Sequence, residues 1–121
     1  MAKILIVDDS PTETKKMEDI LSKEGYSILK AENGDEGVAL AQAALPDLVL
    51  MDVVMPGTNG FQATRQLTKN ASTSHIPVVI VTTKDQETDK LWGKRQGASD
   101  YITKPIDKKH LVRVVKESLV N

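Results

Sequence analysis

The sequence predicts an α/β fold in which five parallel strands form one doubly wound sheet with helices on both faces. Short apolar runs without alternating polar residues recur along the chain, which is the pattern of strands covered on both faces. A stretch with helical spacing follows each run, and this alternation is typical of a parallel sheet with right-handed crossovers. The 121 residues contain no internal repeat or linker, so we expect a single domain over residues 1–121.

The first unit shows the signals most clearly. Residues 3–7 form an unbroken apolar run that ends on two acids, and a helix is expected over about residues 11–24. Ser10 is a suitable N-cap, and Glu13 follows it at the spacing of a capping box. Gly25 is expected to end the helix.

The later units repeat this pattern with Gly, Asn or Pro at their boundaries. The expected strands are residues 27–31, 48–51, 77–82 and 101–103, and the expected helices are about 35–44, 61–69, 85–96 and 107–119. The fourth helix is mostly charged, and Leu91 and Trp92 are its only large apolar residues. Trp92 can be a partly buried packing residue or an interface anchor, and the sequence leaves both open.

Composition excludes several classes of protein. There is no cysteine for disulfides or thiolate metal sites, and no apolar run long enough to span a bilayer. The net charge of −1 gives no general attraction to nucleic acid. We therefore expect a cytoplasmic protein that binds neither nucleic acid nor membrane. Residues 1–60 carry 11 acidic and 5 basic residues, whereas residues 61–121 carry 6 and 11, which indicates two differently charged surfaces.

Polar and charged side chains that could bind a ligand or take part in a reaction lie at the carboxyl ends of the expected strands. Asp8 and Asp9 follow the first strand, Asp52 the third, Thr82 ends the fourth, and Lys104 follows the fifth. Taken singly, an acid at such a position is usually a turn or capping residue. A single threonine there usually has a hydroxyl that is already hydrogen-bonded within the fold. Together they converge on one crevice, where carboxylates would repel each other unless a divalent cation lay between them. All-oxygen ligation suits Mg²⁺, and an acid beside Mg²⁺, an ammonium and a hydroxyl can accept a phosphoryl group.

These positions carry a family resemblance. The pairs Asp8-Asp9 and Lys104-Pro105, together with Asp52, Thr82 and the loop of residues 55–60, resemble the receiver domain of two-component response regulators along the whole chain. The resemblance implies the flavodoxin-like order of the five strands. It also implies that Asp52 is the phosphoacceptor, that the Lys104–Pro105 bond is cis, and that Lys104 pairs with phosphoryl oxygens.

The resemblance further implies a metal set and a switch. Asp9 would bind Mg²⁺ directly and Asp8 largely through water, with Asp52 and the backbone carbonyl of Val54 completing the protein ligands. Thr82 would turn toward the phosphoryl group while Tyr101 changes rotamer behind it. A chemotaxis-type histidine kinase would supply the phosphoryl group.

The chain is also expected to act without an attached DNA-binding domain, by docking on another protein as a monomer. Residues 61–68, 81–90 and 92–97 resemble receivers of type IV pilus twitching-motility systems. We expect the fourth helix, fifth strand and last helix to bind the partner, through Lys90, Trp92, Lys94, Arg95, Tyr101, Lys108 and Lys109.

Other functions fit less well. The protein could drain phosphoryl groups from the same relay as a phosphate sink, which the sequence does not distinguish from an activating role. A phosphatase of the aspartyl-phosphate kind needs a second acid two residues after its nucleophile, where this chain has Val54, so we expect no enzyme acting on external phosphoesters. A flavin-binding module would need a Ser/Thr/Gly loop after the first strand, where acids stand instead.

Overall fold

The computed structural model describes residues 1–57 and 59–120, and it has the predicted doubly wound architecture. Five parallel strands form one sheet in the order β2-β1-β3-β4-β5. The strands are β1 (Lys3–Val7), β2 (Ser27–Ala31), β3 (Leu48–Met51), β4 (Val78–Thr82) and β5 (Asp100–Thr103). The helices are α1 (Pro11–Lys23), α2 (Gly34–Ala44), α3 (Gly60–Lys69), α4 (Glu87–Arg95) and α5 (Lys108–Leu119).

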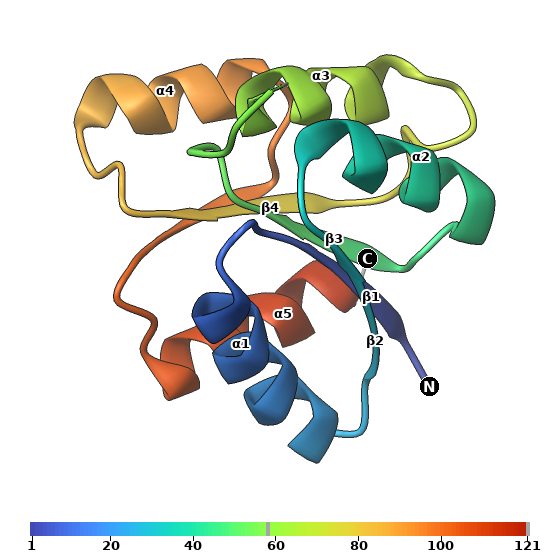
Figure 1. The fold of residues 1–121 in the computed structure, drawn as a ribbon, viewed down its shortest axis with the longest axis vertical. Coiled ribbons are helices and arrows are strands. Elements are labelled where there is room, and N and C mark those ends of the chain that lie inside the picture. The colour runs from blue at the N-terminus through green and yellow to red at the C-terminus, as the bar shows by residue number, and fades with distance from the viewer. Residues whose placement is uncertain (58, 121) are drawn as a thin grey trace.

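The helices form a layer on each side of the sheet. Figure 1 shows α1 and α5 against one face, and α2, α3 and α4 against the other. Successive residues of β1 accordingly belong to different cores: Ile4 and Ile6 pack in the cluster that includes residues of α1 and α5, and Leu5 and Val7 in the cluster that includes residues of α2 and α3. This double burial explains the unbroken apolar runs in the sequence.

The register of the central strands places the expected functional residues together. Val7 pairs with Met51, so Asp8 and Asp52 leave neighbouring strands side by side. Thr82 pairs with Thr103 at the same end of β4 and β5, and Lys104 is the next residue. The carboxyl ends of four strands therefore meet at one rim of the sheet.

The start of α4 differs from the prediction. We expected this helix from residue 85, but it begins at Glu87, with Gln86 as its N-cap. The carboxylate of Asp89 accepts a hydrogen bond from the Gln86 backbone N–H at 3.3 Å. This bond makes Gln86 the N-cap of α4, so Asp85 stays in the preceding loop.

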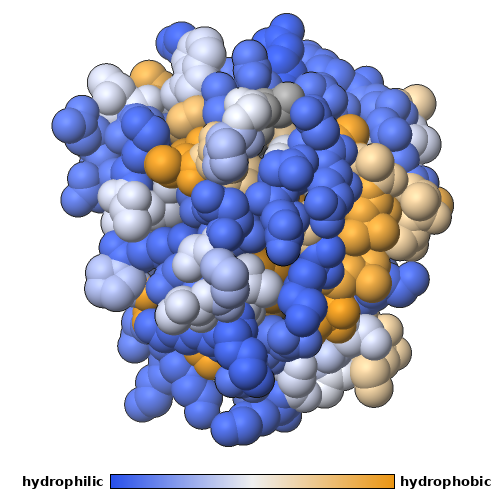
Figure 2. All heavy atoms as spheres, in the orientation of Figure 1, coloured by the Kyte–Doolittle hydropathy of each residue, from blue (hydrophilic) through white to orange (hydrophobic). Residues whose placement is uncertain are grey.

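The molecular surface is mostly hydrophilic on the face seen in Figure 2, with hydrophobic atoms gathered near the edge strand β2. Ile28 and Leu29 of this strand are only partly buried. Among residues 1–57 and 59–120, no helix combines the length and apolar character needed to cross a bilayer.

Candidate functional site

Asp8 lies at the end of β1 in a nearly closed environment. The residue is 3% exposed. One carboxylate oxygen, Oδ1, accepts a hydrogen bond from the Ser10 backbone N–H at 2.9 Å, and Oδ2 accepts one from Lys104 Nζ at 2.8 Å. Both oxygens are thus bound to donors, as a buried carboxylate requires.

Asp52 follows β3 and has a similar environment. The residue is 6% exposed, and its backbone N–H donates to the Val7 carbonyl at 3.0 Å, which fixes it beside β1. Its Oδ1 accepts a hydrogen bond from the Val54 N–H at 3.0 Å, and its Oδ2 accepts one from Lys104 Nζ at 3.2 Å. Gly60 allows the loop to return this closely, because a Cβ there would overlap the backbone carbonyl of Asp52.

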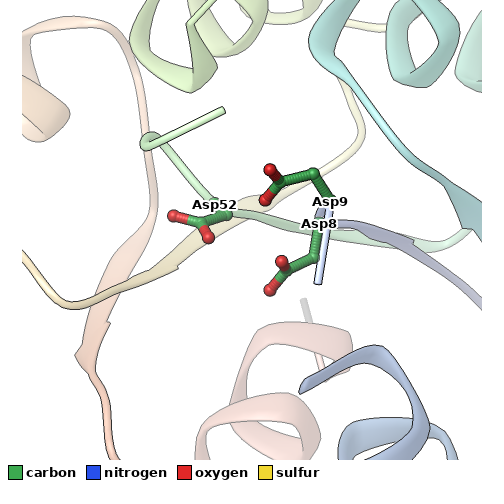
Figure 3. A group of neighbouring side chains, drawn as sticks. All are labelled: Asp8, Asp9 and Asp52. Atoms are coloured by element: carbon green, nitrogen blue, oxygen red, sulfur yellow. The ribbon is translucent and has the colours of Figure 1, made fainter. Parts of the chain in front are cut away.

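The three predicted acids converge at this rim. Carboxylate oxygens of Asp8, Asp9 and Asp52 lie within 4.8 Å of one another, and Figure 3 shows them at the ends of two neighbouring strands. Asp9 is exposed, so the cluster is open to solvent on its side. A hollow of about 330 Å³, lined in part by Asp8 and Asp9, adjoins it. A set of oxygen ligands with an open side fits a hard divalent cation that keeps several waters.

Lys104 is the counter-ion of this cluster, and its side chain is 9% exposed. Burial is the largest influence on the pKa of Asp8 and raises it, although the hydrogen bonds from Lys104 and Ser10 oppose the shift. Burial lowers the pKa of Lys104, but the hydrogen bond to Asp8 and the negative charge of Asp52 outweigh it, so the pKa of the ammonium is raised. The ammonium therefore stays charged at neutral pH. The Lys104–Pro105 bond is cis, the isomer that the resemblance implies.

The fourth predicted strand end carries an unpaired hydroxyl. Thr82 is fully buried, and its Oγ1 has no hydrogen-bond partner among the described residues. Buried hydroxyls are nearly always paired in folded proteins, so this group is available for a contact that the fold itself does not make.

Tyr101 lies on β5 next to α4. Its hydroxyl donates a hydrogen bond to the Lys84 carbonyl at 2.8 Å. A Cβ on Gly93 would stand 3.3 Å from the Tyr101 ring, so the glycine lets the helix approach the ring closely. Burial raises the pKa of Tyr101 to about 12, with smaller contributions from the charges of Asp89 and Asp52.

The predicted partner-binding residues do not share one environment. Most are exposed, whereas Tyr101 is partly buried. Trp92 is 50% exposed and belongs to neither core cluster, so its indole is half-buried at the surface of α4. Leu91 beside it is 52% exposed, so two large apolar side chains stand on the surface of α4.

Glu13 was not predicted to belong to the site. Its spacing from Ser10 predicted a capping box in α1, but the carboxylate lies beside Lys104, with 4.0 Å between Oε1 and Nζ. The acidic residue at the third helical position was visible in the sequence. The sequence did not show that the Asp8 carboxylate would compete with Glu13 and accept the hydrogen bond from the Ser10 N–H.

Comparisons with known proteins agree with this geometry. The family model for the response regulator receiver domain matches residues 4–116. The chain is 67% identical over 119 residues to the protein PilH of Pseudomonas aeruginosa, covering 98% of each chain. It is 43% identical over 106 residues to the response regulator PleD of Caulobacter vibrioides, covering 88% of this chain but 23% of PleD. The solved structure of the chemotaxis protein CheY4 of Vibrio cholerae superimposes with a TM-score of 0.92 at 31% identity, covering 98% of this chain and 99% of that one.

Proposed function

Because the chain belongs to the response regulator receiver domain family, we propose that it is a phosphorylation-controlled switch in which Asp52 accepts a phosphoryl group from a histidine kinase. The observation that carries the proposal is the placement of Asp52. It is buried to 6% exposure, it lies within 4.8 Å of two further carboxylates, and its Oδ2 contacts the Lys104 ammonium. A carboxylate used only to stabilise the fold would not need two more acids beside it.

The transfer is a displacement at phosphorus. One Asp52 carboxylate oxygen forms a bond to the phosphorus of a phosphohistidine while the P–N bond breaks, and the electron pair of that bond stays on the imidazole nitrogen, which takes a proton. The product is an acyl phosphate on Asp52. We assign Asp8, Asp9, Asp52 and the Val54 backbone carbonyl as the groups that hold Mg²⁺. When bound, this cation neutralises charge on the phosphoryl oxygens.

Three residues would respond to the new group. A protein phosphate adds about 1.5 to 2 negative charges at pH 7, and Lys104 is close enough to Asp52 to pair with it. The unpaired Thr82 hydroxyl would donate a hydrogen bond to a phosphoryl oxygen. Tyr101 would then exchange its bond to the Lys84 carbonyl for another rotamer, which changes the surface next to α4.

The proposed output is a protein–protein contact on α4, β5 and α5, in type IV pilus or chemotaxis-like signalling. The 67% identity with PilH over 98% of both chains supports the pilus role. The exposed Trp92 provides an apolar anchor, and Lys90, Lys94 and Arg95 are exposed cations of the same helix. An acidic or mixed-charge partner fits this surface. Charge reversal at Lys90 and Arg95 is expected to weaken that partner's binding, and unchanged affinity would count against the assignment.

The phosphorylation itself is tested by intact mass spectrometry after incubation with acetyl phosphate and Mg²⁺. We expect one phosphoryl adduct on the wild type and none with chelator or on Asp52→Asn. An adduct that persists in Asp52→Asn would refute the assignment of the acceptor. If no adduct forms, a beryllofluoride titration separates rapid hydrolysis, in which the analogue still binds, from a site that is unable to bind a phosphoryl group.

A further inference from the structure

Glu13 has a buried oxygen that the fold does not satisfy. Its Oε1 is buried and has no hydrogen-bond partner among the described residues, although the side chain as a whole is 30% exposed. The same oxygen lies 4.0 Å from Lys104 Nζ, within reach of an ion pair but too far for a hydrogen bond. The carboxylate of an acid at the start of a helix is normally hydrated by solvent or accepts a hydrogen bond in a capping box.

The local structure explains why Glu13 turns inward. Its backbone N–H donates to Ser10 Oγ at 3.3 Å, which is half of a capping box. The other half would need the Ser10 N–H as a donor to the Glu13 carboxylate, but this N–H already donates to Asp8 Oδ1 at 2.9 Å. Asp8 has thus taken the capping donor, and the Glu13 carboxylate lies next to Lys104 instead.

Lys104 therefore stands among three carboxylates with different roles. Its ammonium has three donors, of which one goes to Asp8 and one to Asp52. Asp52 is the proposed acceptor and Asp8 is part of the acidic cluster, so both lose or share Lys104 once a phosphoryl group and a divalent cation are bound. Glu13 is outside that cluster, so we expect its attraction for the ammonium to be the same in both states.

We infer that Glu13 is a positioning residue for Lys104, one that holds the ammonium in its place before phosphorylation and opposes its movement to a phosphoryl group on Asp52. The inference rests on the proposed function, because it concerns the same lysine and the same acceptor. Glu13 thereby weakens the phosphorylated state relative to the unphosphorylated one. It touches neither the phosphoryl donor nor the reacting atoms.

The test replaces Glu13 by Gln, which keeps the length of the side chain and its capping geometry but removes the charge. Glu18→Gln is the matched control, because Glu18 is an acid of the same helix whose carboxylate pairs with Lys30 at 3.1 Å instead of Lys104. Any general effect of one fewer negative charge near an anion site appears in both variants. Urea unfolding of each variant checks that the fold is retained.

Beryllofluoride in the presence of Mg²⁺ serves as the phosphoryl analogue, and fluorine NMR measures its binding. Glu13→Gln is expected to bind it about threefold more tightly than Glu18→Gln does, the size of one ion pair with a partly exposed partner. In a Lys104→Met background the same substitution is expected to change nothing, since the effect passes through the lysine. Without the analogue, Glu13→Gln should shift the NMR resonance of the Lys104 ammonium, whereas Glu18→Gln should leave it in place.

Equal beryllofluoride affinities of the two Gln variants would overturn the role of Glu13 and leave the proposed function intact. An effect of Glu13→Gln that is undiminished in the Lys104→Met background would also overturn it, because Glu13 would then act on the anion directly. If Lys104→Met does not fold, an unshifted Lys104 resonance in Glu13→Gln decides against the inference. A wild type that binds no analogue and forms no adduct on Asp52 would refute the proposed function first and this inference with it.

Discussion

Replacing Lys104 by Met tests the electrostatic account of the site. Removal of one partner from a buried ion pair typically costs about 3–5 kcal/mol, because the remaining charge is left uncompensated. Here two carboxylates lose the ammonium, with side chains of Asp8 and Asp52 that are 1% and 8% exposed. The hydrogen bonds from the Ser10 and Val54 N–H groups remain, and one carboxylate can take up a proton. We therefore expect the free energy of unfolding to fall by about 3 kcal/mol, at the lower end of that range.

The assay is urea denaturation in the presence of chelator, with Lys116→Met as the matched control. Lys116 pairs with Glu24 at 3.3 Å, but its side chain is 59% exposed, and such pairs contribute about 0–1 kcal/mol. Mg²⁺ should then stabilise Lys104→Met more than wild type, because the cation takes over the lost role; at a hundredfold excess over the dissociation constant it adds about 2.7 kcal/mol. A Lys104→Met variant no less stable than Lys116→Met in chelator would show that the Lys104 ammonium does not stabilise the buried carboxylates of Asp8 and Asp52.

Two further predictions concern β5 and α4. The pKa of Tyr101 is raised to about 12 from 10.0, so its neutral form contributes stability that is complete below pH 10.0 and is lost as the pH rises to about 12. Tyrosinate absorbance should show this late titration in the wild type and lose it in Tyr101→Phe; a single step at the ordinary value would contradict the packing against α4. Trp92 is 50% exposed and lies outside both cores, so Trp92→Ala should cost less than about 1 kcal/mol in urea unfolding, against about 3–5 kcal/mol for a buried aromatic. A loss in the latter range would place the indole in the core.

The fold could be predicted from sequence because its central strands are buried on both faces. Every residue of β3 and β4 is buried, so these strands appear as short runs of 4 and 5 mostly apolar residues, a length that favours a strand over a helix. The convergence of Asp8, Asp9 and Asp52 followed from the parallel topology alone, since strands of one sheet end at a common rim.

What could not be predicted depended on competition between neighbouring groups. Near the first turn of α1, two carboxylates could accept a hydrogen bond from the Ser10 N–H. Only the structure shows that Asp8 accepts it and that the Glu13 carboxylate lies beside Lys104 instead. The start of α4 depended similarly on Asp89, which bonds the Gln86 N–H. The exposure of Trp92 was undetermined because a short helix with few apolar residues has no clear buried stripe. In α4 the buried residue is Gly93, which gives no hydrophobic signal.

Locating the phosphoryl group on the chain tests directly whether Asp52 is the phosphoacceptor. Borohydride reduces an aspartyl phosphate to homoserine with release of phosphate, and peptide mass spectrometry then identifies the residue. After treatment with acetyl phosphate and Mg²⁺, we predict homoserine at position 52 alone, and none when chelator replaces the metal. Homoserine at Asp8 or Asp9, or its formation at position 52 without any divalent cation, would contradict the assignment of Asp52 as a metal-dependent phosphoacceptor.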